Sequence, residues 1–497
     1  MKQELPQETK EKLNSLLELF KNKNSTETLE QISYLLFIKR LEEDDNAKQL
    51  DDNYESIFKN KENCKWSIFS KMSGSQNNEQ KGILEHVRDI VFPFLRELDE
   101  DKFYYAKYLK NSTFTIENSQ ALIEAINLIA SEELKRRSSS TDGLIYDYLL
   151  SQLNVEGDNK QYKTPDHIID MMVELVAPDA DDVICDPVCA TGGFLVHAYE
   201  KILKSYTSKE FLEKKELVAD KLGKEKRAKL EKNIFGFNDN QSMTRTAMMN
   251  LMMHMIKNPN IIQNHTLSAR YDEQEKYSLI LSNPKFNEKI NESDLNSSFT
   301  IKTADKSIYL YLELVMRLLS TGGRAAIIVS EGLIFDTKGQ GKTLKQTLLK
   351  DCRLDAVIKL HSKIFQPFGK DVSTSILIFT KSEKTEEVLF YEMENDGLSI
   401  DKKRTKVDKT DIPDIIEKFK TKDSNEFNDR TQKYFKVPFK EIKDNNYDLS
   451  FNTYKDFIYE EKKYDSSESM LSNIITAEEN ILENSKKILQ ITKGGLN

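Results

Sequence analysis

The sequence predicts an α/β protein with three parts: an N-terminal helical bundle, a doubly wound, Rossmann-like sheet domain, and a helix at the C-terminus. Residues 1–150 contain few Gly or Pro residues and carry apolar residues at helical spacing. From about 155 to 385, short apolar runs alternate with helical stretches, which is the pattern of a doubly wound parallel sheet. The last thirty or so residues return to a helical pattern.

The pattern divides the chain into four predicted segments. Residues 1–150 form the helical domain and 151–385 the sheet domain, 386–464 complete the region of the sheet domain with shorter strands, and 465–497 form the final helix. Six apolar runs are candidate strands: 182–185, 233–237, 278–282, 324–329, 354–359 and 375–380.

The C-terminal helix carries apolar pairs every seven residues, at 474/475, 481/482 and 488/489. A seven-residue repeat forms a seam that fits a partner helix, so we expect this helix to make a subunit contact. Packing of the same stripe on the chain's own domain is the open alternative.

Composition narrows the class of protein. The net charge is −9, and an acidic chain grips DNA phosphates poorly by itself, so a partner is expected to share any contact with DNA. The chain lacks a run of eighteen apolar residues and an apolar signal core, which predicts a cytoplasmic protein that does not enter a membrane. Cys185 and Cys189 have no second pair or nearby His to complete a zinc site, so no metal is predicted.

A Gly-rich turn follows the first candidate strand and opens a helix. Such a turn lets backbone N–H groups and a helix N-terminus approach a ligand closely. The residues expected to bind a ligand here are Asp186, Pro187, Ala190, Thr191, Gly192, Gly193 and Phe194.

A second motif, Asn283-Pro284-Lys285-Phe286, directly follows the candidate strand 278–282. It therefore lies at the carboxyl end of that strand, where doubly wound folds bind ligands. The motif is nearly Asn-Pro-Pro-Phe, the tetrapeptide with which amino methyltransferases hold a base.

The two motifs, in this order, resemble those of the modification (M) subunit of type I restriction-modification systems, an N6-adenine DNA methyltransferase family. Further matches cover nearly the whole chain, at 34–41, 142–150, 161–165, 322–326, 365–375, 396–397, 402–404 and 446–450. The resemblance implies a class I methyltransferase domain, S-adenosylmethionine as cofactor and DNA as substrate. It also implies a separate specificity subunit that reads the DNA sequence, with a second copy of the chain and a nuclease or translocase subunit as further candidate partners.

The resemblance also implies roles for single residues. The catalytic motif is Asn283, Pro284, Lys285 and Phe286: the Asn side chain and the Pro carbonyl accept hydrogen bonds from the adenine amino group, and the Phe stacks on the flipped base. Tyr162, Thr164 and Pro165 correspond to a segment that packs over the methionine end of the cofactor. Asn238 and His265 stand where the family carries acids near the ribose and the adenine.

Five positions depart from the family pattern. Ala190 replaces a Gly, Lys285 replaces a Pro, and acids are replaced at Asn238, His265 and Ser278. We expect Asp239, beside Asn238, to point to the other side of the chain. Three carboxylates would then be missing around a cationic cofactor, which predicts weak or absent binding. The five departures together are expected to weaken the binding free energy of the cofactor by roughly 3–5 kcal/mol.

Three hypotheses of function remain open. The first is a pseudoenzyme: a degenerate M subunit that keeps the fold and binds duplex DNA as a scaffold or sensor within a multisubunit anti-phage defence complex. The second is an active, site-specific DNA adenine-N6 methyltransferase working with a specificity subunit. The third is binding of another nucleotide in the altered pocket.

Overall fold

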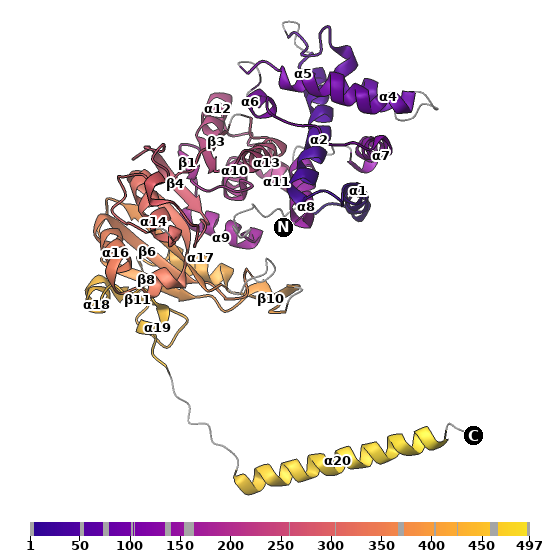
Figure 1. Cartoon of the computed structure of the whole chain (residues 1–497). Helices are drawn as coiled ribbons and strands as arrows, with labels where there is room; N and C mark the ends of the chain where they lie inside the picture. Colours follow the sequence, from indigo (N-terminus) through magenta and orange to yellow (C-terminus); the bar gives the residue numbers. More distant parts are fainter. Residues whose placement is uncertain are drawn as a thin grey trace. The chain divides into compact units, whose positions relative to one another are not determined.

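The computed structural model describes residues 4–49, 54–72, 79–100, 103, 105–134, 141–153, 164–257, 259–303, 305–365, 372–401, 404–424, 426–457 and 466–494, and the statements below refer to these. The chain divides into two compact units, Met1–Tyr454 and Lys455–Asn497, which are described separately (Figure 1).

The first unit begins with a bundle of helices around its own hydrophobic core. Leu13, Leu16, Ile32, Leu35 and Ile38 are fully buried, which confirms the helical periodicity of the first part of the sequence. Asn residues open two of the helices, since Asn24 caps α2 and Asn118 caps α7 through their side-chain oxygens. The helices are α1 Gln7–Glu18, α2 Ser25–Lys48, α3 Trp66–Met72, α4 Glu79–His86, α5 Phe92–Arg96, α6 Ala106–Leu109, α7 Ser119–Ala130 and α8 Thr141–Leu153.

A nine-stranded sheet in the order β11-β8-β6-β7-β5-β4-β1-β2-β3 forms the centre of the α/β region. Its strands are β1 Ile184–Asp186, β2 Ile234–Asn238, β3 Asn260–Gln263, β4 Tyr277–Ser282, β5 Leu319–Ser330, β6 Cys352–Lys359, β7 Thr374–Lys381, β8 Glu387–Glu392 and β11 Tyr434–Pro438. All six candidate strands are present, and the α/β fold class is confirmed. The sheet is mixed, however: β7 runs antiparallel to β5 and β6, and β11 runs antiparallel to β8. Continuous apolar runs predict burial on both faces, but they do not encode strand direction.

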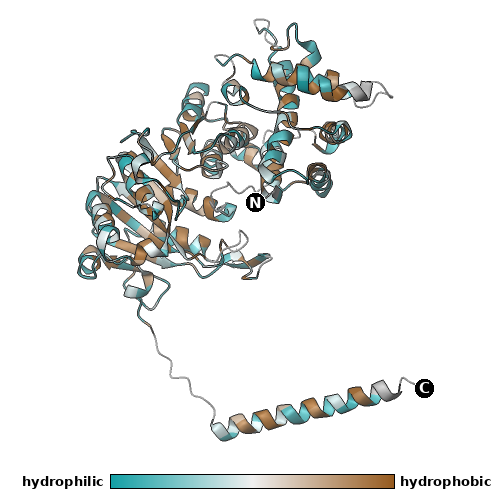
Figure 2. Ribbon diagram, viewed as in Figure 1, coloured by the Kyte–Doolittle hydropathy of each residue, from teal (hydrophilic) through white to brown (hydrophobic). Residues whose placement is uncertain are grey.

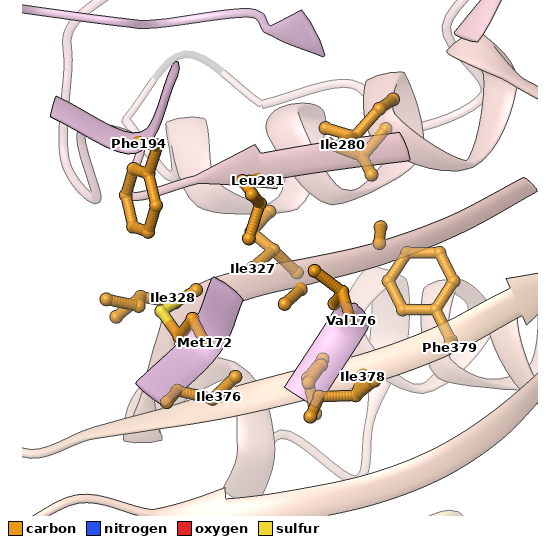
Figure 3. Close-up of a cluster of buried hydrophobic side chains, with 14 of the residues drawn as sticks. Met172, Val176, Phe194, Ile280, Leu281, Ile327, Ile328, Ile376, Ile378 and Phe379 are labelled. Carbon is orange, nitrogen blue, oxygen red and sulfur yellow. The ribbon is translucent and has the colours of Figure 1, made fainter. Parts of the chain in front are cut away.

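Helices pack on the sheet, and the rest of the unit is short elements. Met172 and Val176 of α9 lie in one buried cluster with Ile328 of β5 and Ile376 and Ile378 of β7 (Figure 3). The helices are α9 Asp166–Val176, α10 Gly193–Ser205, α11 Lys209–Glu213, α12 Lys224–Lys232, α13 Gln241–Met253, α14 Ser307–Leu318, α15 Glu331–Phe335, α16 Gly339–Asp351, α17 Ile412–Lys420, α18 Phe439–Asp444 and α19 Phe451–Tyr454. A small hairpin joins β9 Asp396–Leu398 to β10 Lys406–Thr410.

Helix α13 joins the helical bundle to the α/β region. Its Met249 and Met253 lie in the core of the bundle, while Ala247 and Leu251 lie in the core of the α/β region. Arg245 of α13 forms an ion pair with Glu30 of α2. The two cores are therefore held together by one shared helix.

A buried histidine follows α13 at the same junction. The His254 ring contacts Asp147 of α8 through Nε2 at 3.2 Å and Glu200 of α10 through Nδ1 at 2.9 Å. Burial by itself lowers the pKa of His254, but the two carboxylates more than offset this and raise it to about 10. The imidazolium thus links one helix of the bundle to one helix of the α/β region.

We expect His254→Gln to lower the free energy of unfolding by about 2–4 kcal/mol at pH 6, because it leaves two partly buried carboxylates without their cation. The pKa of His254 is raised in the folded state, so its contribution is complete below the unfolded pKa of about 6.5 and is lost as pH rises through about 10. Urea unfolding of the wild-type and His254→Gln proteins at pH 6 and pH 9.5 measures the gap, which is the difference between their free energies of unfolding. A gap that stays the same at both pH values contradicts the assignment of the charge.

The second unit contains helix α20, Ser467–Gly494, which confirms the predicted C-terminal helix. Its apolar pairs are strongly exposed: Ile474 and Ile475 are each 55% exposed, and Ile481 and Leu482 are 65% and 56% exposed. Figure 2 shows hydrophobic bands that recur along this helix. An apolar stripe of this length is costly in water. Among the described residues, no helix has the length and apolarity needed to cross a membrane.

Candidate functional site

A cavity lies at the carboxyl ends of β1, β2 and β4, where the two sequence motifs meet. Of the residues expected to bind a cofactor or base, nine line it: Thr164, Asp186, Ala190, Thr191, Gly193, Phe194, Asn238, Asn283 and Lys285. Pro165, Pro187, Gly192, Pro284 and Phe286 are chain neighbours of these lining residues. Tyr162 lies outside the described residues.

The Gly-rich turn has the strained backbone that its sequence suggests. Gly192 has a φ of 81°, a left-handed conformation that favours Gly, and a Cβ there would lie 2.5 Å from Leu251 Cδ1. Ala190 also has a positive φ, of 47°. An L-residue in this region costs about 1–2 kcal/mol, so Ala190 stores strain in the turn.

Asp186 ends β1 beneath this turn. Its Oδ1 accepts hydrogen bonds from Ser282 Oγ at 2.8 Å and from the Val188 N–H at 3.1 Å. Burial raises the pKa of Asp186 to about 7, against the effect of these two donors. Asp186 therefore ties the ends of β1 and β4 together directly beside the cavity.

Asn238, at the end of β2, holds the Gly-rich turn. Its Nδ2 donates to the Ala190 carbonyl at 3.0 Å and to Cys189 Sγ at 3.2 Å. A carboxylate at this position could not donate either hydrogen bond. The Asn238 amide, at the position where the resemblance predicts an acid, therefore braces the loop.

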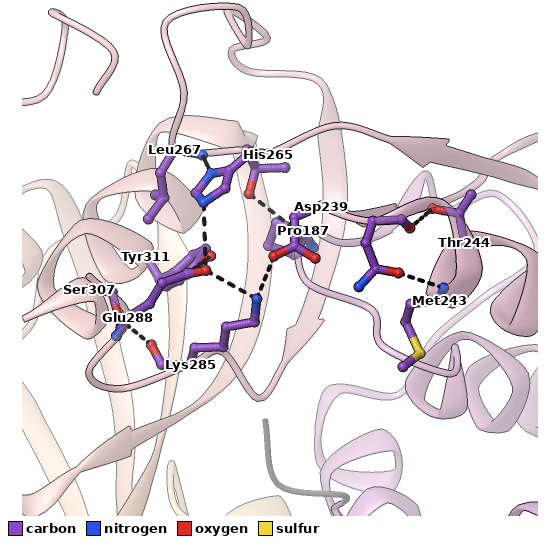
Figure 4. A network of polar contacts seen from close by, with 12 residues as sticks. Pro187, Asp239, Met243, Thr244, His265, Leu267, Lys285, Glu288, Ser307 and Tyr311 are labelled. Carbon is purple, nitrogen blue, oxygen red and sulfur yellow. Dashed lines mark hydrogen bonds and ion pairs between the residues drawn. The ribbon is translucent and has the colours of Figure 1, made fainter. Parts of the chain in front are cut away.

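Asp239 lines the cavity, and the expectation that it points away is wrong. Its Oδ2 lies 2.7 Å from Lys285 Nζ, which also lies 3.1 Å from Glu288 Oε1 (Figure 4). The neighbour of a strand's last residue is free of the strand's alternation, which is why the sequence argument failed here. Lys285, the third residue of the base motif, is only 7% exposed and pairs with both carboxylates.

The base motif is fixed by hydrogen bonds on both sides. Asn283 Nδ2 donates to Thr164 Oγ1 at 2.9 Å, which brings the predicted cofactor segment and the base motif into contact. Ser307 Oγ donates to the Lys285 carbonyl at 2.6 Å and accepts from the Glu288 N–H at 2.9 Å. Phe286 is 6% exposed and packs in the main core.

Two other departures lie outside this cavity. Ser278, at the start of β4, donates to Asp182 Oδ1 at 2.7 Å, and five residues of strand separate it from Asn283 by about 16 Å. The expectation that Ser278 marks a carboxylate missing around the cofactor is therefore wrong. His265 is not among the residues that line the cavity. Its Nε2 lies 3.7 Å from Glu288 Oε1, so it contacts the cluster of Lys285, Asp239 and Glu288 through Glu288.

Sequence reasoning missed several residues of the cavity. Asp147 lies in α8, inside the matching segment 142–150, but it was not among the predicted site residues. Asn250 comes from α13, which carries no motif, and its Nδ2 donates to the Thr191 carbonyl at 2.9 Å. Asp166 and His197 also line the cavity. Asp147, inside the matching segment 142–150, and Asp166, which follows the predicted cofactor residue Pro165, each had a signal in the sequence near this site.

Comparisons with known proteins agree with this arrangement. Residues 138–463 match the N-6 DNA Methylase family, and residues 9–129 match the HsdM N-terminal domain. The methylase subunit of the type I restriction enzyme EcoEI from Escherichia coli is 28% identical over 73% of this chain and 72% of its own length. The StySJI methylase subunit from Salmonella typhimurium is 26% identical over 58% of this chain and 54% of its own length.

A solved structure shares the fold across most of the chain. The type I restriction-modification methyltransferase subunit from Streptococcus thermophilus superposes with a TM-score of 0.67 at 16% identity, covering 90% of this chain and 99% of that one. The family match spans well over half of the residues and includes both sequence motifs. The chain therefore belongs to the N-6 DNA methylase family, in the group formed by the methylase (M) subunits of type I restriction-modification systems.

Proposed function

We propose that this chain is an M subunit whose methyl transfer is weakened or lost, and which contributes the methyltransferase fold to a multisubunit complex that holds duplex DNA in anti-phage defence. Its role there is that of a scaffold or sensor. The observation that carries the proposal is the buried Lys285, paired with Asp239 and Glu288 at the tetrapeptide that would hold the target adenine.

S-adenosylmethionine, which the family implies, fits one end of the cavity and not the other. The Gly-rich turn before α10 supplies the close backbone approach that a ligand needs. At the other end the Asn238 amide is bonded to the turn and the Asp239 carboxylate is bonded to a lysine. A sulfonium cation and its ribose would have to compete with these internal partners, so the residues present do not fit the cofactor well.

The partners follow from charge and from the C-terminal helix. A net charge of −9 favours sharing the DNA contact with another protein, here a specificity-subunit-like DNA-reading protein. The exposed apolar pairs of α20 favour a partner helix as the contact. A second copy of the chain and a nuclease or translocase subunit are further candidate partners.

An active, site-specific adenine-N6 methyltransferase is the alternative, and one observation favours it. Asn283 and Asp239 both line the cavity, so an amide for the base and a carboxylate near the end of β2 are still present. Binding of another, phosphorylated nucleotide is disfavoured, because Asp147, Asp166, Asp186 and Asp239 line the same cavity.

The test is a paired assay on the full chain purified with its specificity partner. We expect the complex to retain duplex DNA in a gel shift, and tritiated S-adenosylmethionine to leave no label in that DNA. An M subunit with an intact family motif, purified in the same way, is the positive control. Label incorporated at a rate near that of the control supports the alternative and contradicts the proposal.

A further inference from the structure

The Lys285 side chain is held in place by two ion pairs. The ammonium lies between carboxylates from two different elements, Asp239 after β2 and Glu288 after β4. The Lys285 carbonyl and the Glu288 N–H are both bonded to Ser307, the first residue of α14. The loop that carries the lysine is therefore anchored at two points and not free to swing.

Glu288 is held on its other side as well. Its Oε2 accepts a hydrogen bond from Tyr311 Oη at 3.0 Å, and its Oε1 lies 3.7 Å from His265 Nε2 (Figure 4). Burial alone would raise the pKa of Glu288, but His265 and Lys285 hold it at about 2. Glu288 is thus a carboxylate at neutral pH, and a buried carboxylate of this kind needs a cation nearby.

The cluster formed by Lys285, Asp239 and Glu288 contains its own cation, the Lys285 ammonium. The ligand that the family implies for this cavity, S-adenosylmethionine, is also a cation. Carboxylates that face a cavity attract a positive ligand, and an internal ammonium among them removes most of that attraction. Lys285 has a second effect, because its bond to Asp239 occupies the carboxylate nearest the end of β2. The first effect depends on the charge of the ligand, and the second acts equally on any ligand that carries the same ribose.

We propose that Lys285 is a specificity-determining residue that sets the charge preference of this cavity, because its ammonium weakens binding of the sulfonium cofactor relative to binding of the uncharged adenosyl thioether. This inference rests on the proposed function for the location of the ligand. The two ligands that separate the effects are S-adenosylhomocysteine and S-adenosylmethionine, which differ by a methyl group and one positive charge on sulfur.

The experiment measures both dissociation constants by equilibrium dialysis for the wild-type chain and for Lys285→Met, Lys285→Arg and Lys289→Met. Lys289 is an exposed lysine of the same loop and serves as the matched control. We expect Lys285→Met to raise the affinity for both ligands, because Asp239 is released, and to shift the ratio of affinities about tenfold further toward S-adenosylmethionine. Lys285→Arg keeps the charge and Lys289→Met lies outside the cluster, so neither should move the ratio. Thermal unfolding of each variant checks that the fold is retained.

Several outcomes overturn the inference. An unchanged ratio in Lys285→Met, or an equal shift in Lys289→Met, shows that Lys285 does not set the preference. If the wild-type chain binds neither ligand measurably, the gain of S-adenosylmethionine binding in Lys285→Met supports the inference, and binding of neither ligand by that variant overturns it. The proposed function fails on a different result, methyl transfer by the wild-type complex, which leaves the ratio shift as a separate finding.

Discussion

Lys285→Pro alone is expected to leave methyl transfer to DNA below detection, although it restores the Asn-Pro-Pro-Phe motif. The substitution removes the internal cation and returns a rigid φ to the loop. The strained Ala190 turn remains, and the Asn238 amide still donates to that turn in place of a ribose acid. A positioned adenine amine cannot react with a cofactor that is rarely bound.

Restoring activity should require changes on the cofactor side as well. We expect label to enter adenine only when Lys285→Pro is combined with Ala190→Gly and Asn238→Glu, with a gain of at least about a hundredfold over the single variant, the equivalent of about 3 kcal/mol. The measurement is tritiated methyl incorporation with DNA and the specificity partner present. Robust methylation by Lys285→Pro alone would show that the base motif, and not the cofactor side, is what limits this protein.

Removal of α20 is expected to abolish assembly with the partner while leaving the first unit stable. A chain ending at Tyr464 loses the exposed apolar stripe, while every residue of the Met1–Tyr454 unit is kept. Because that unit has its own cores, its thermal midpoint should move by less than about 2 °C. Size-exclusion chromatography of the co-expressed subunits measures assembly.

A pair of point variants sharpens this test. Ile481→Lys places a charge in the stripe, and Asn480→Lys places the same charge outside it, since Asn480 lies about 100° from Ile481 and about 160° from Leu482 around the helix. We expect only Ile481→Lys to weaken assembly. An aggregated or unfolded chain after truncation, or equal loss with both lysines, would show that the stripe packs on the chain's own domain.

The sequence predicted most of the fold because its signals are local. Apolar runs of strand length marked β1, β2, β4, β5, β6 and β7, and the two turn motifs marked the carboxyl ends of β1 and β4. The direction of β7 was not predictable from composition, because a buried strand has the same apolar run in either direction. The bundle's contact with α13 was also missed, since nothing in the local pattern shows which core a Met enters.

The candidate site was predicted less completely, and for a physical reason. Sequence motifs identify residues that share a turn, whereas charge balance depends on residues that meet only in space. Asp239 follows β2, whereas Lys285 and Glu288 follow β4, so their pairing joins two loops that are distant in the sequence. Ser278 shows the opposite error, because a position close in sequence to Asn283 lies at the far end of the same strand.

The central claim is that internal partners have replaced the cofactor's contacts in an M subunit that keeps the family fold. Calorimetric titration of S-adenosylmethionine into the purified full-length chain tests this most directly. We predict a dissociation constant weaker than about 100 μM, equivalent to less than about 5.5 kcal/mol of binding free energy. Binding at about 1 μM or tighter would contradict the account, and the chain should then be treated as an ordinary adenine methyltransferase.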